Sequence, residues 1–288
     1  MTPRQAPAGF ATLVEDDIIV DGVRLAFSVQ GEGDPVVFVH GTPSHSFLWR
    51  NIAPRVRDAG FQTVVYDLLG FGRSERPLGR DTSVAAQADL LPALLDALGI
   101  ESANIIAHDI GGAVGQILAV RRPRRIRKLM MIDTVTYDSW PSQTWRRIIR
   151  DSGDLRYVND EDEFSSMLSR QLRMTVSDPE SMNDAILRNY LLPHDGVTGR
   201  ASFFTHQVKH YDSRYTQEIS SQLPALTMPV RIVWGEDDLW QPVSYAERLC
   251  RDIPGAQLSI VSKAGHFLPE DAPDQLTQEI LDFLGSAS

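Results

Sequence analysis

The sequence contains very little cysteine and no long apolar stretch. Cys250 is the only cysteine among 288 residues, so an internal disulfide is excluded. No apolar run approaches the roughly 20 residues that a membrane-spanning helix requires. Residues 1–16 also lack the apolar segment of a secretory signal. We therefore expect a cytoplasmic protein without membrane contact, present as a monomer or a homodimer.

Basic residues are outnumbered as well. There are 28 Lys and Arg against 38 Asp and Glu, which gives a formal net charge of −10. A negative protein binds nucleic acid and anionic membranes poorly, and we expect the basic run at 121–128 to cover a helix end. The sequence shows no Cys/His cluster with metal-ligand spacing and no dinucleotide-binding glycine fingerprint. We therefore expect no metal and no cofactor, and a small-molecule substrate as the partner.

Short apolar runs alternate with helix-like segments along most of the chain. Strands are expected at residues 18–20, 23–29, 35–40, 63–66, 104–107, 126–132, 230–234 and 257–261, and helices at about 83–98 and 112–121. Asp21-Gly22 predicts a hairpin turn between the first two strands. Runs that are apolar throughout, such as 35–40, are typical of strands buried on both faces of a parallel sheet. The alternation predicts an α/β fold with a doubly wound sheet.

Residues 137–224 interrupt this alternation. The segment is polar and helix-like, with scattered aromatic residues, and it is too long for a structureless loop inside a compact domain. We interpret it as a helical lid over one end of the sheet. The core is then predicted to consist of residues 17–136 and 225–288.

The central chemical signal is Ala107-His108-Asp109-Ile110-Gly111-Gly112. A buried strand ends here and a glycine-rich helix begins, which is typical of the tight turn that presents a nucleophile, usually written G-x-S-x-G. Asp109 occupies the position of the nucleophile. A carboxylate there attacks a saturated carbon that bears a leaving group and forms an ester with it. The alternative is that Asp109 only caps the helix.

Three further elements support the catalytic interpretation. His40-Gly41-Thr42-Pro43 follows a predicted strand, so the N–H groups of Thr42 and Ile110 are expected to form an oxyanion hole, with a simple turn as the alternative. His266 follows the last predicted strand and is the expected general base. Asp238 or Asp133, each of which follows a strand, is expected to orient it and complete an Asp-His-Asp triad.

Five motifs resemble the epoxide hydrolase and haloalkane dehalogenase group of α/β-hydrolases. They are HGTP (40–43), YDLLGFGRSERP (66–77), AHDIGG (107–112), GEDD (235–238) and AGHF (264–267), and the resemblance extends from about residue 17 to 285. It implies the α/β-hydrolase fold, with a mostly parallel eight-stranded sheet flanked by helices and a helical lid. It also implies hydrolysis through a covalent ester on Asp109, without a cofactor.

The departures from that group bear on the substrate. Haloalkane dehalogenases usually have a halide-binding tryptophan where this chain has Ile110, and many have asparagine where it has Thr42. Fluoroacetate dehalogenases carry arginines at the places of Ile110 and Ala113, and their orienting acid occupies the place of Asp133. These differences favour an epoxide or a similar strained oxygen ring. A haloalkane is the alternative, and a ligand-binding pseudoenzyme of the same fold is a further one.

The resemblance also indicates which residues bind the substrate. Epoxide hydrolases use two lid tyrosines to protonate the opening oxygen, which a phenol can do. Tyr157 and either Tyr211 or Tyr215 lie at suitable places in the sequence, although packing within the lid is the alternative. Trp145 and Phe203 are further candidates to line an apolar pocket. The complete set expected to bind substrate is His40, His108, Trp140, Tyr157, Tyr211 and Phe267.

Overall fold

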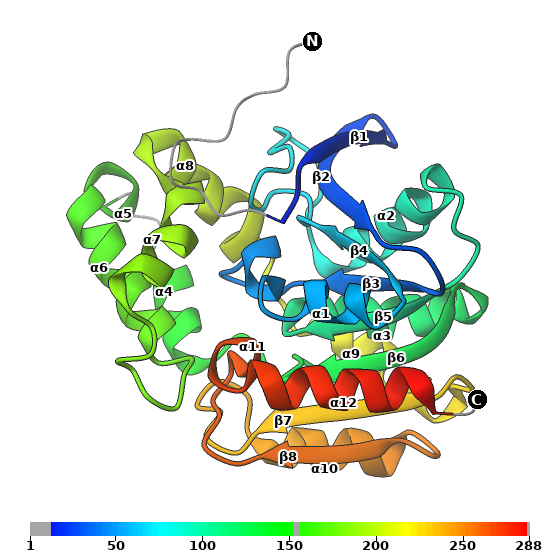
Figure 1. Cartoon of the computed structure of the whole chain (residues 1–288). Helices are drawn as coiled ribbons and strands as arrows, with labels where there is room; N and C mark the ends of the chain where they lie inside the picture. Colours follow the sequence, from blue (N-terminus) through cyan, green and yellow to red (C-terminus); the bar gives the residue numbers. More distant parts are fainter. Residues whose placement is uncertain (1–12, 152–155, 287–288) are drawn as a thin grey trace.

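The computed structural model describes residues 13–151 and 156–286, and an eight-stranded sheet forms its centre (Figure 1). The strands are β1 (Asp16–Val20), β2 (Val23–Gln30), β3 (Pro35–Val39), β4 (Gln62–Tyr66), β5 (Ala103–His108), β6 (Ile126–Ile132), β7 (Val230–Gly235) and β8 (Gln257–Val261). Their order in the sheet is β1-β2-β4-β3-β5-β6-β7-β8. The β1–β2 and β2–β4 pairs are antiparallel and all other pairs are parallel. This confirms the predicted mostly parallel sheet.

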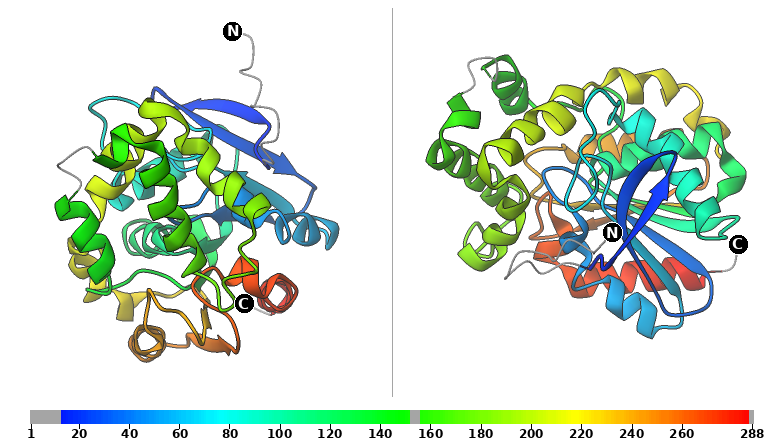
Figure 2. Two further views of the ribbon diagram at one scale, coloured as in Figure 1. Left: turned by 90° about the vertical axis from the view of Figure 1, so that its left-hand side faces the viewer. Right: turned by 90° about the horizontal axis from the view of Figure 1, so that it is seen from above.

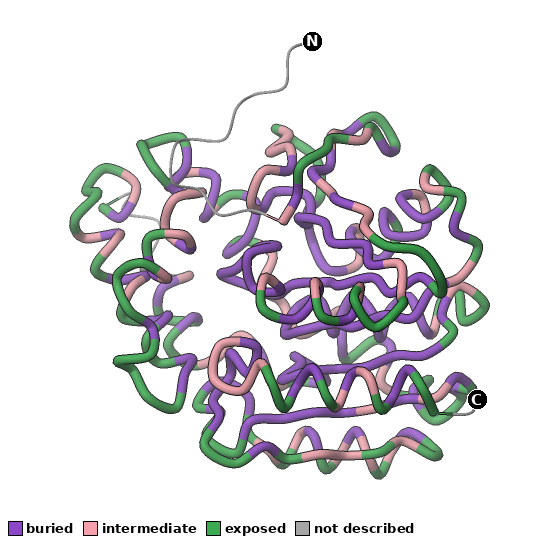
Figure 3. Tube along the Cα trace, viewed as in Figure 1, coloured by how far each residue is buried: buried purple, intermediate pink, exposed green. Residues whose placement is uncertain are grey.

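The central strands are buried on both faces, as their unbroken apolar sequences predict. All five residues of β3 and all six of β5 are buried. Successive side chains of a strand point to opposite faces. Accordingly, Val37 and Val39 belong to one hydrophobic cluster, whereas Val36 and Phe38 belong to the other. Figure 3 shows the resulting buried centre, with exposed positions confined to the outer surfaces.

Helices cover both faces of the sheet. On one face lie α2 (Val84–Ala97), α3 (Ile110–Arg121) and α10 (Val243–Asp252), and on the other lie α1 (Ala53–Asp58) and α12 (Pro273–Gly285). Short helical turns connect them: η1 (Ser46–Trp49), η2 (Pro123–Arg125) and α11 (Leu268–Asp271). Ser83 starts α2, where its hydroxyl accepts a hydrogen bond from the Ala86 N–H.

The lid segment, residues 137–224, is helical between β6 and β7. It contains α4 (Gln143–Asp151), α5 (Arg156–Asn159), α6 (Glu161–Arg173), α7 (Asp184–Leu191), η4 (Leu192–His194), α8 (Gly196–Ser202), η5 (Phe203–Gln207), η6 (Val208–His210), α9 (Arg214–Ser220) and η7 (Leu223–Ala225). Figure 2 shows α4 to α8 gathered at one end of the sheet. The boundaries of the core and the lid stay a prediction. Tyr137 and Ile219, near the two ends of the lid segment, pack into the same hydrophobic cluster as residues of the strands.

The lid segment is tied to the core at several points. Thr82 Oγ1 donates to the backbone oxygen of His206 at 2.6 Å, and the Phe267 N–H donates to that of Thr175 at 2.7 Å. Among the described helices, none combines the length and the apolarity that crossing a bilayer requires. The lid stands at the end where the parallel strands have their carboxyl ends, so residues that follow those strands gather beneath it (Figure 1).

Candidate active site

Asp109 stands at a strained turn between β5 and α3. Its backbone has φ 52° and ψ −119°, a conformation that non-glycine residues rarely adopt. The turn also requires glycine nearby, because a Cβ on Gly111 would stand 2.5 Å from the Val39 backbone oxygen. The Asp109 side chain makes no capping hydrogen bond to α3. The helix-cap alternative therefore does not describe this residue, and its carboxylate is free to face the site.

One carboxylate oxygen of Asp109 is held by the loop that follows β3. The Thr42 N–H donates to Asp109 Oδ1 at 2.7 Å, in a buried contact between residues far apart in the sequence. Gly41 permits this approach, since a Cβ there would stand 2.4 Å from the Asp109 Cβ. The oxyanion role expected of the Thr42 N–H stays a prediction. Ile110 begins α3 directly after Asp109, and its role as the second donor stays a prediction.

His266 lies between two carboxylates. Its Nδ1 is 2.8 Å from Asp238 Oδ2, and its Nε2 is 3.4 Å from Asp109 Oδ2. Asp238 is itself fixed, because its Oδ1 accepts hydrogen bonds from the backbone N–H groups of Trp240 and Gln241 at 2.7 and 2.8 Å. The structure thus brings together the expected nucleophile, base and orienting acid, all of which are buried. Their catalytic roles remain proposals.

The two carboxylates change the acidity of the imidazole. Burial by itself lowers the pKa of His266, but the charges of Asp238 and Asp109, the hydrogen bond to Asp238 and the close contact with Asp109 outweigh it. The net effect raises the pKa of His266 well above its ordinary value of 6.5. The two carboxylates on either side of the ring therefore favour the protonated imidazolium form of His266.

Asp133, the other candidate acid, makes a different contact. It is fully buried after β6, and its Oδ1 accepts a hydrogen bond from the Gly235 N–H at 2.7 Å. Its Oδ2 has no hydrogen-bond partner among the described residues. Burial and the nearby charge of Asp238 raise the pKa of Asp133 well above its usual range. The geometry therefore favours Asp238 over Asp133 as the acid that orients His266.

His40 and His108 are buried structural groups in this arrangement. The His40 ring bonds to the Gly41 carbonyl and accepts from the Leu68 N–H, and burial lowers its pKa to about 4. His108 Nε2 donates to the His266 carbonyl at 2.8 Å, and burial lowers its pKa to about 3. Since backbone groups occupy both nitrogens of His40, we do not include it among the proposed substrate-binding residues.

Among the candidate tyrosines, Tyr211 reaches the site. Its phenol oxygen forms a short contact with Thr42 Oγ1, and its ring packs edge-on against Trp145, with centroids 5.4 Å apart. Burial raises the pKa of the half-buried Tyr211, so the phenol keeps its proton at neutral pH. The ring of Trp140 lies 6.5 Å from the ring of Tyr211, measured between centroids, and the Trp140 Nε1 donates to Thr216 Oγ1.

The other two tyrosines have partners elsewhere. Tyr157 stacks on Phe204 and accepts a hydrogen bond from Arg156, on α5 at the outer end of the lid (Figure 1). Tyr215 accepts a hydrogen bond from Arg214. The structure therefore does not bring Tyr157 to the carboxylate cluster, because the helix that carries it packs within the lid. We do not propose it as a proton donor.

Further aromatic side chains surround His266. Phe267 is buried and packs against His108 and His266, with ring centroids 5.3 and 5.9 Å apart. Trp240, which the sequence pattern did not single out, packs in a tilted arrangement against His266, with ring centroids 5.1 Å apart, and also contacts Trp145 at 6.0 Å. The sequence did offer one indication of this contact, because Trp240 comes two residues after the candidate acid Asp238. No group of three or more potential metal-ligating side chains occurs among residues 13–151 and 156–286.

Comparisons with known proteins agree with the fold. Residues 34–273 match the family model described as alpha/beta hydrolase fold. A cis-3-alkyl-4-alkyloxetan-2-one decarboxylase of Shewanella oneidensis is 30% identical over 92% of this chain and 86% of its own. Haloalkane dehalogenase 2 of Mycobacterium bovis is 27% identical over 91% and 92%. The structure of an alpha/beta hydrolase fold protein from Burkholderia ambifaria matches with a TM-score of 0.88 and 31% identity, over 95% of this chain and 99% of that one.

Proposed function

Because this chain belongs to the α/β-hydrolase fold family, we propose that it hydrolyses a small, largely apolar epoxide through a covalent ester on Asp109. One observation carries the proposal. Asp109 is held at a strained strand-to-helix turn, its side chain is free of the helix amides, and it lies between the Thr42 N–H and His266. A carboxylate in this position serves as a nucleophile toward a saturated carbon.

In the first step, Asp109 Oδ2 attacks an epoxide carbon and the C–O bond of the ring breaks. The Thr42 N–H already holds Oδ1, which leaves Oδ2 as the attacking atom. The opening oxygen needs a proton, and Tyr211 supplies it, because its phenol is protonated and lies beside Thr42. The products of this step are a hydroxyalkyl ester on Asp109 and a tyrosinate at Tyr211.

Ester formation also changes His266. The imidazolium owes its raised pKa partly to the charge of Asp109, and that charge disappears when the ester forms. The pKa of His266 therefore falls, while the tyrosinate needs a proton. Transfer of one proton from His266 to Tyr211 leaves a neutral imidazole and a restored phenol. The base thus becomes available only after the first step has occurred.

In the second step, neutral His266 takes a proton from water, and the resulting hydroxide attacks the ester carbonyl. The oxyanion forms on Oδ1, where the Thr42 N–H already donates and the Ile110 N–H is proposed to join it. Collapse of this intermediate breaks the ester C–O bond, and the leaving alkoxide takes the proton of the newly added hydroxyl, so the diol leaves and the Asp109 carboxylate is restored. His266 ends as an imidazolium between Asp109 and Asp238, so the resting charges are recovered.

A haloalkane is the second candidate substrate, and two observations favour it. A haloalkane dehalogenase is among the relatives. In addition, the buried Trp145 Nε1 has no hydrogen-bond partner among the described residues, and an indole N–H of this kind suits a halide. Against it, Ile110 occupies the position after the nucleophile. An alkyl-substituted oxetan-2-one, as named for the Shewanella relative, is also a strained oxygen ring, and it belongs in the same test.

The proposal is tested by trapping the ester. His266→Gln removes the base but leaves Asp109, so incubation with styrene oxide should add the mass of the epoxide to the intact protein. The double variant His266→Gln/Asp109→Asn is the matched control and should gain no mass. Halide release and an adduct with 1-bromobutane alone would support the dehalogenase. Failure of styrene oxide, 1-bromobutane and a dialkyl oxetan-2-one to label the variant would remove support for the aspartyl ester and favour a ligand-binding pseudoenzyme.

A further inference from the structure

Three polar side chains from distant parts of the chain meet beside α11, the short helix that follows the loop of His266. Arg50 ends η1, Tyr190 lies on α7 of the lid segment, and Glu270 lies on α11. The guanidinium of Arg50 donates two hydrogen bonds to the Glu270 carboxylate, from Nη1 to Oε1 at 2.6 Å and from Nη2 to Oε2 at 2.7 Å. The Tyr190 hydroxyl donates to the same Oε1. We refer to Arg50, Tyr190 and Glu270 as the Glu270 cluster.

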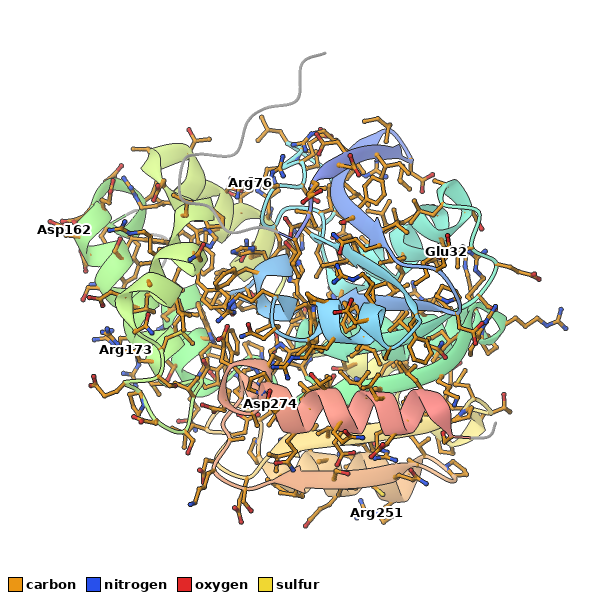
Figure 4. All side chains as sticks on the ribbon, viewed as in Figure 1. Glu32, Arg76, Asp162, Arg173, Arg251 and Asp274 are labelled. Atoms are coloured by element: carbon orange, nitrogen blue, oxygen red, sulfur yellow. The ribbon has the colours of Figure 1, made fainter. Side chains whose placement is uncertain are left out.

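The Glu270 cluster is largely buried. The Glu270 side chain is 5% exposed, that of Arg50 is 21% exposed, and Tyr190 is fully buried. Asp274, which Figure 4 labels where α12 begins, differs in this respect, because it and its partner Arg55 on α1 form an exposed ion pair. Replacing a buried ion pair by apolar side chains of similar volume is often neutral for stability, whereas removing one partner is strongly destabilising. Stability alone therefore gives no reason for an ion pair at this buried position.

The ion pair joins two segments that are far apart in the sequence. Arg50 Nη1 also donates to the Phe47 carbonyl at 3.2 Å, which fixes the guanidinium to η1, the turn that follows β3. At the other end, the Glu270 N–H donates to the carbonyl of Phe267 at 2.8 Å, and Phe267 comes directly after His266. The bidentate pair therefore fastens the loop of His266 to the core segment that follows β3.

Aromatic packing extends this connection to the imidazole. The ring of Tyr190 packs against Phe267, with centroids 5.6 Å apart, and edge-on against Phe47, at 5.4 Å. The ring of Phe267 in turn packs against His266, with centroids 5.9 Å apart. A displacement of Tyr190 therefore moves the side chain against which the imidazole packs.

We infer that Glu270 is a positioning residue for His266. Arg50 and Tyr190 hold its carboxylate, and the loop fastened in this way keeps the imidazole at the distance from Asp109 that ester hydrolysis requires. This inference rests on the proposed function, because it concerns the second chemical step. Position matters strongly in catalysis, since a displacement of about 1 Å can reduce a rate by about 10²-fold. The alternative is that the Glu270 cluster only fastens the lid segment and contributes to stability.

Removing all three polar groups at once distinguishes these roles. The variant Arg50→Met/Tyr190→Phe/Glu270→Met leaves no member of the cluster charged, so its urea midpoint should lie close to that of the wild type. In single-turnover kinetics with styrene oxide, ester hydrolysis should nevertheless slow on the order of 10²-fold. Ester formation should change by less than about threefold, because Asp109 and Tyr211 lie outside the cluster. Recovery of both stability and hydrolysis would overturn the inference.

A second buried ion pair provides the matched control. Arg231 on β7 and Glu279 on α12 form a pair whose side chains are 16% and 21% exposed. Arg231 also donates to Gln257 at the start of β8, so this pair lies at the opposite end of the parallel strands from the loop of His266. Arg231→Met/Glu279→Met should therefore leave ester hydrolysis within about twofold of the wild type. A loss equal to that of the triple variant would contradict the positioning role.

Tyr190→Phe keeps the test decisive if the triple variant does not fold. It removes one hydrogen-bond donor and retains the ring, so the protein should fold. Ester hydrolysis should slow by about two- to tenfold, which corresponds to the loss of one hydrogen bond. Unchanged hydrolysis in Tyr190→Phe would refute the part of the inference that concerns the lid.

NMR titration of His266 tests the positioning without any substrate. Arg50 and Glu270 carry opposite charges, so replacing both leaves the net charge unchanged, and the pKa of His266 then reports the place of its ring. The ionisable groups that face the imidazole are kept in the triple variant: Asp109, Asp133, Asp238 and His108. We expect a lower pKa of His266 in the triple variant than in the wild type, because a displaced ring contacts the carboxylates less closely.

This titration also separates the inference from the proposed function. If no substrate forms an ester while the pKa of His266 falls in the triple variant, the proposed function fails and the positioning role stands. An unchanged pKa of His266 in a folded triple variant would refute the positioning role, whatever the activity.

Discussion

His108 and His266 are joined by a hydrogen bond from the His108 Nε2 to the backbone carbonyl of His266, over 2.8 Å. His108 directly precedes Asp109, and both histidines are completely buried. A carbonyl oxygen only accepts, so the proton of His108 is on Nε2. The bond therefore ties the strand that carries the proposed nucleophile to the loop that carries the proposed base, and it helps to fix the distance between them.

His108→Phe keeps an aromatic ring but removes this donor. We expect the free energy of unfolding to fall by about 1–3 kcal/mol, because a buried carbonyl loses its partner. The second chemical step should slow more than the first, since only the second uses His266 as a base. Single-turnover kinetics with epoxide measure the two steps separately. His108→Gln, which can still donate an N–H, should restore part of the loss. Equal slowing of both steps would mean that His108 acts only through packing.

Asp133 and Asp238 are expected to respond differently to conversion into asparagine. Asp133→Asn keeps the oxygen that accepts from the Gly235 N–H and replaces a carboxyl group whose raised pKa favours the neutral form, so activity should change by less than about threefold. Asp238→Asn removes the carboxylate that faces His266 Nδ1, and ester hydrolysis should slow by roughly 10³–10⁴-fold. The reverse ranking, measured as the rate of ester breakdown, would assign the orienting role to Asp133.

The sequence could not choose between these two acids. Both follow neighbouring parallel strands, so both reach the same edge of the sheet. Backbone donors decide the outcome, because the Gly235 N–H binds Asp133 whereas the Trp240 and Gln241 N–H groups hold Asp238 toward His266. Such donors belong to the loop conformation and leave no mark in residue type.

The strands, turns and site residues that the sequence predicts correctly are those marked by a pattern of neighbouring residues. β3 is apolar at every position, and the hairpin between β1 and β2 turns at Asp21-Gly22. Asp109 was identified as a candidate because its motif lies between a strand and a glycine-rich helix start. The lid tyrosines had no such signal. Tyr157 lies in α5 and Tyr211 directly follows η6, and tertiary packing alone brings Tyr211 to Thr42.

Tyr211→Phe separates the two candidate leaving groups. An epoxide oxygen must be protonated as the ring opens, and a positioned general acid contributes about 10²–10⁴-fold to such a step. We expect a loss of that size in the rate of adduct formation with styrene oxide in the His266→Gln background. A halide leaves without a proton, so labelling by 1-bromobutane, if it occurs, should change little. An unchanged rate with styrene oxide would remove Tyr211 as the donor.

The acidity of His266 provides the last prediction. Asp109→Asn replaces the carboxylate by a neutral amide and so imitates the charge of the ester, which removes part of what raises the pKa of His266. NMR titration should show a pKa of His266 well above 6.5 in the wild type and a lower one in the variant.

The raised pKa of His266 also makes the free energy of unfolding depend on pH. In the wild type, the contribution of His266 is complete below the unfolded pKa of about 6.5 and is lost as the pH rises through the higher folded pKa. Urea unfolding above pH 6.5 should therefore show a decline of stability with pH that continues further in the wild type than in Asp109→Asn. Identical pKa values in the two proteins would contradict the proposal that ester formation releases the base.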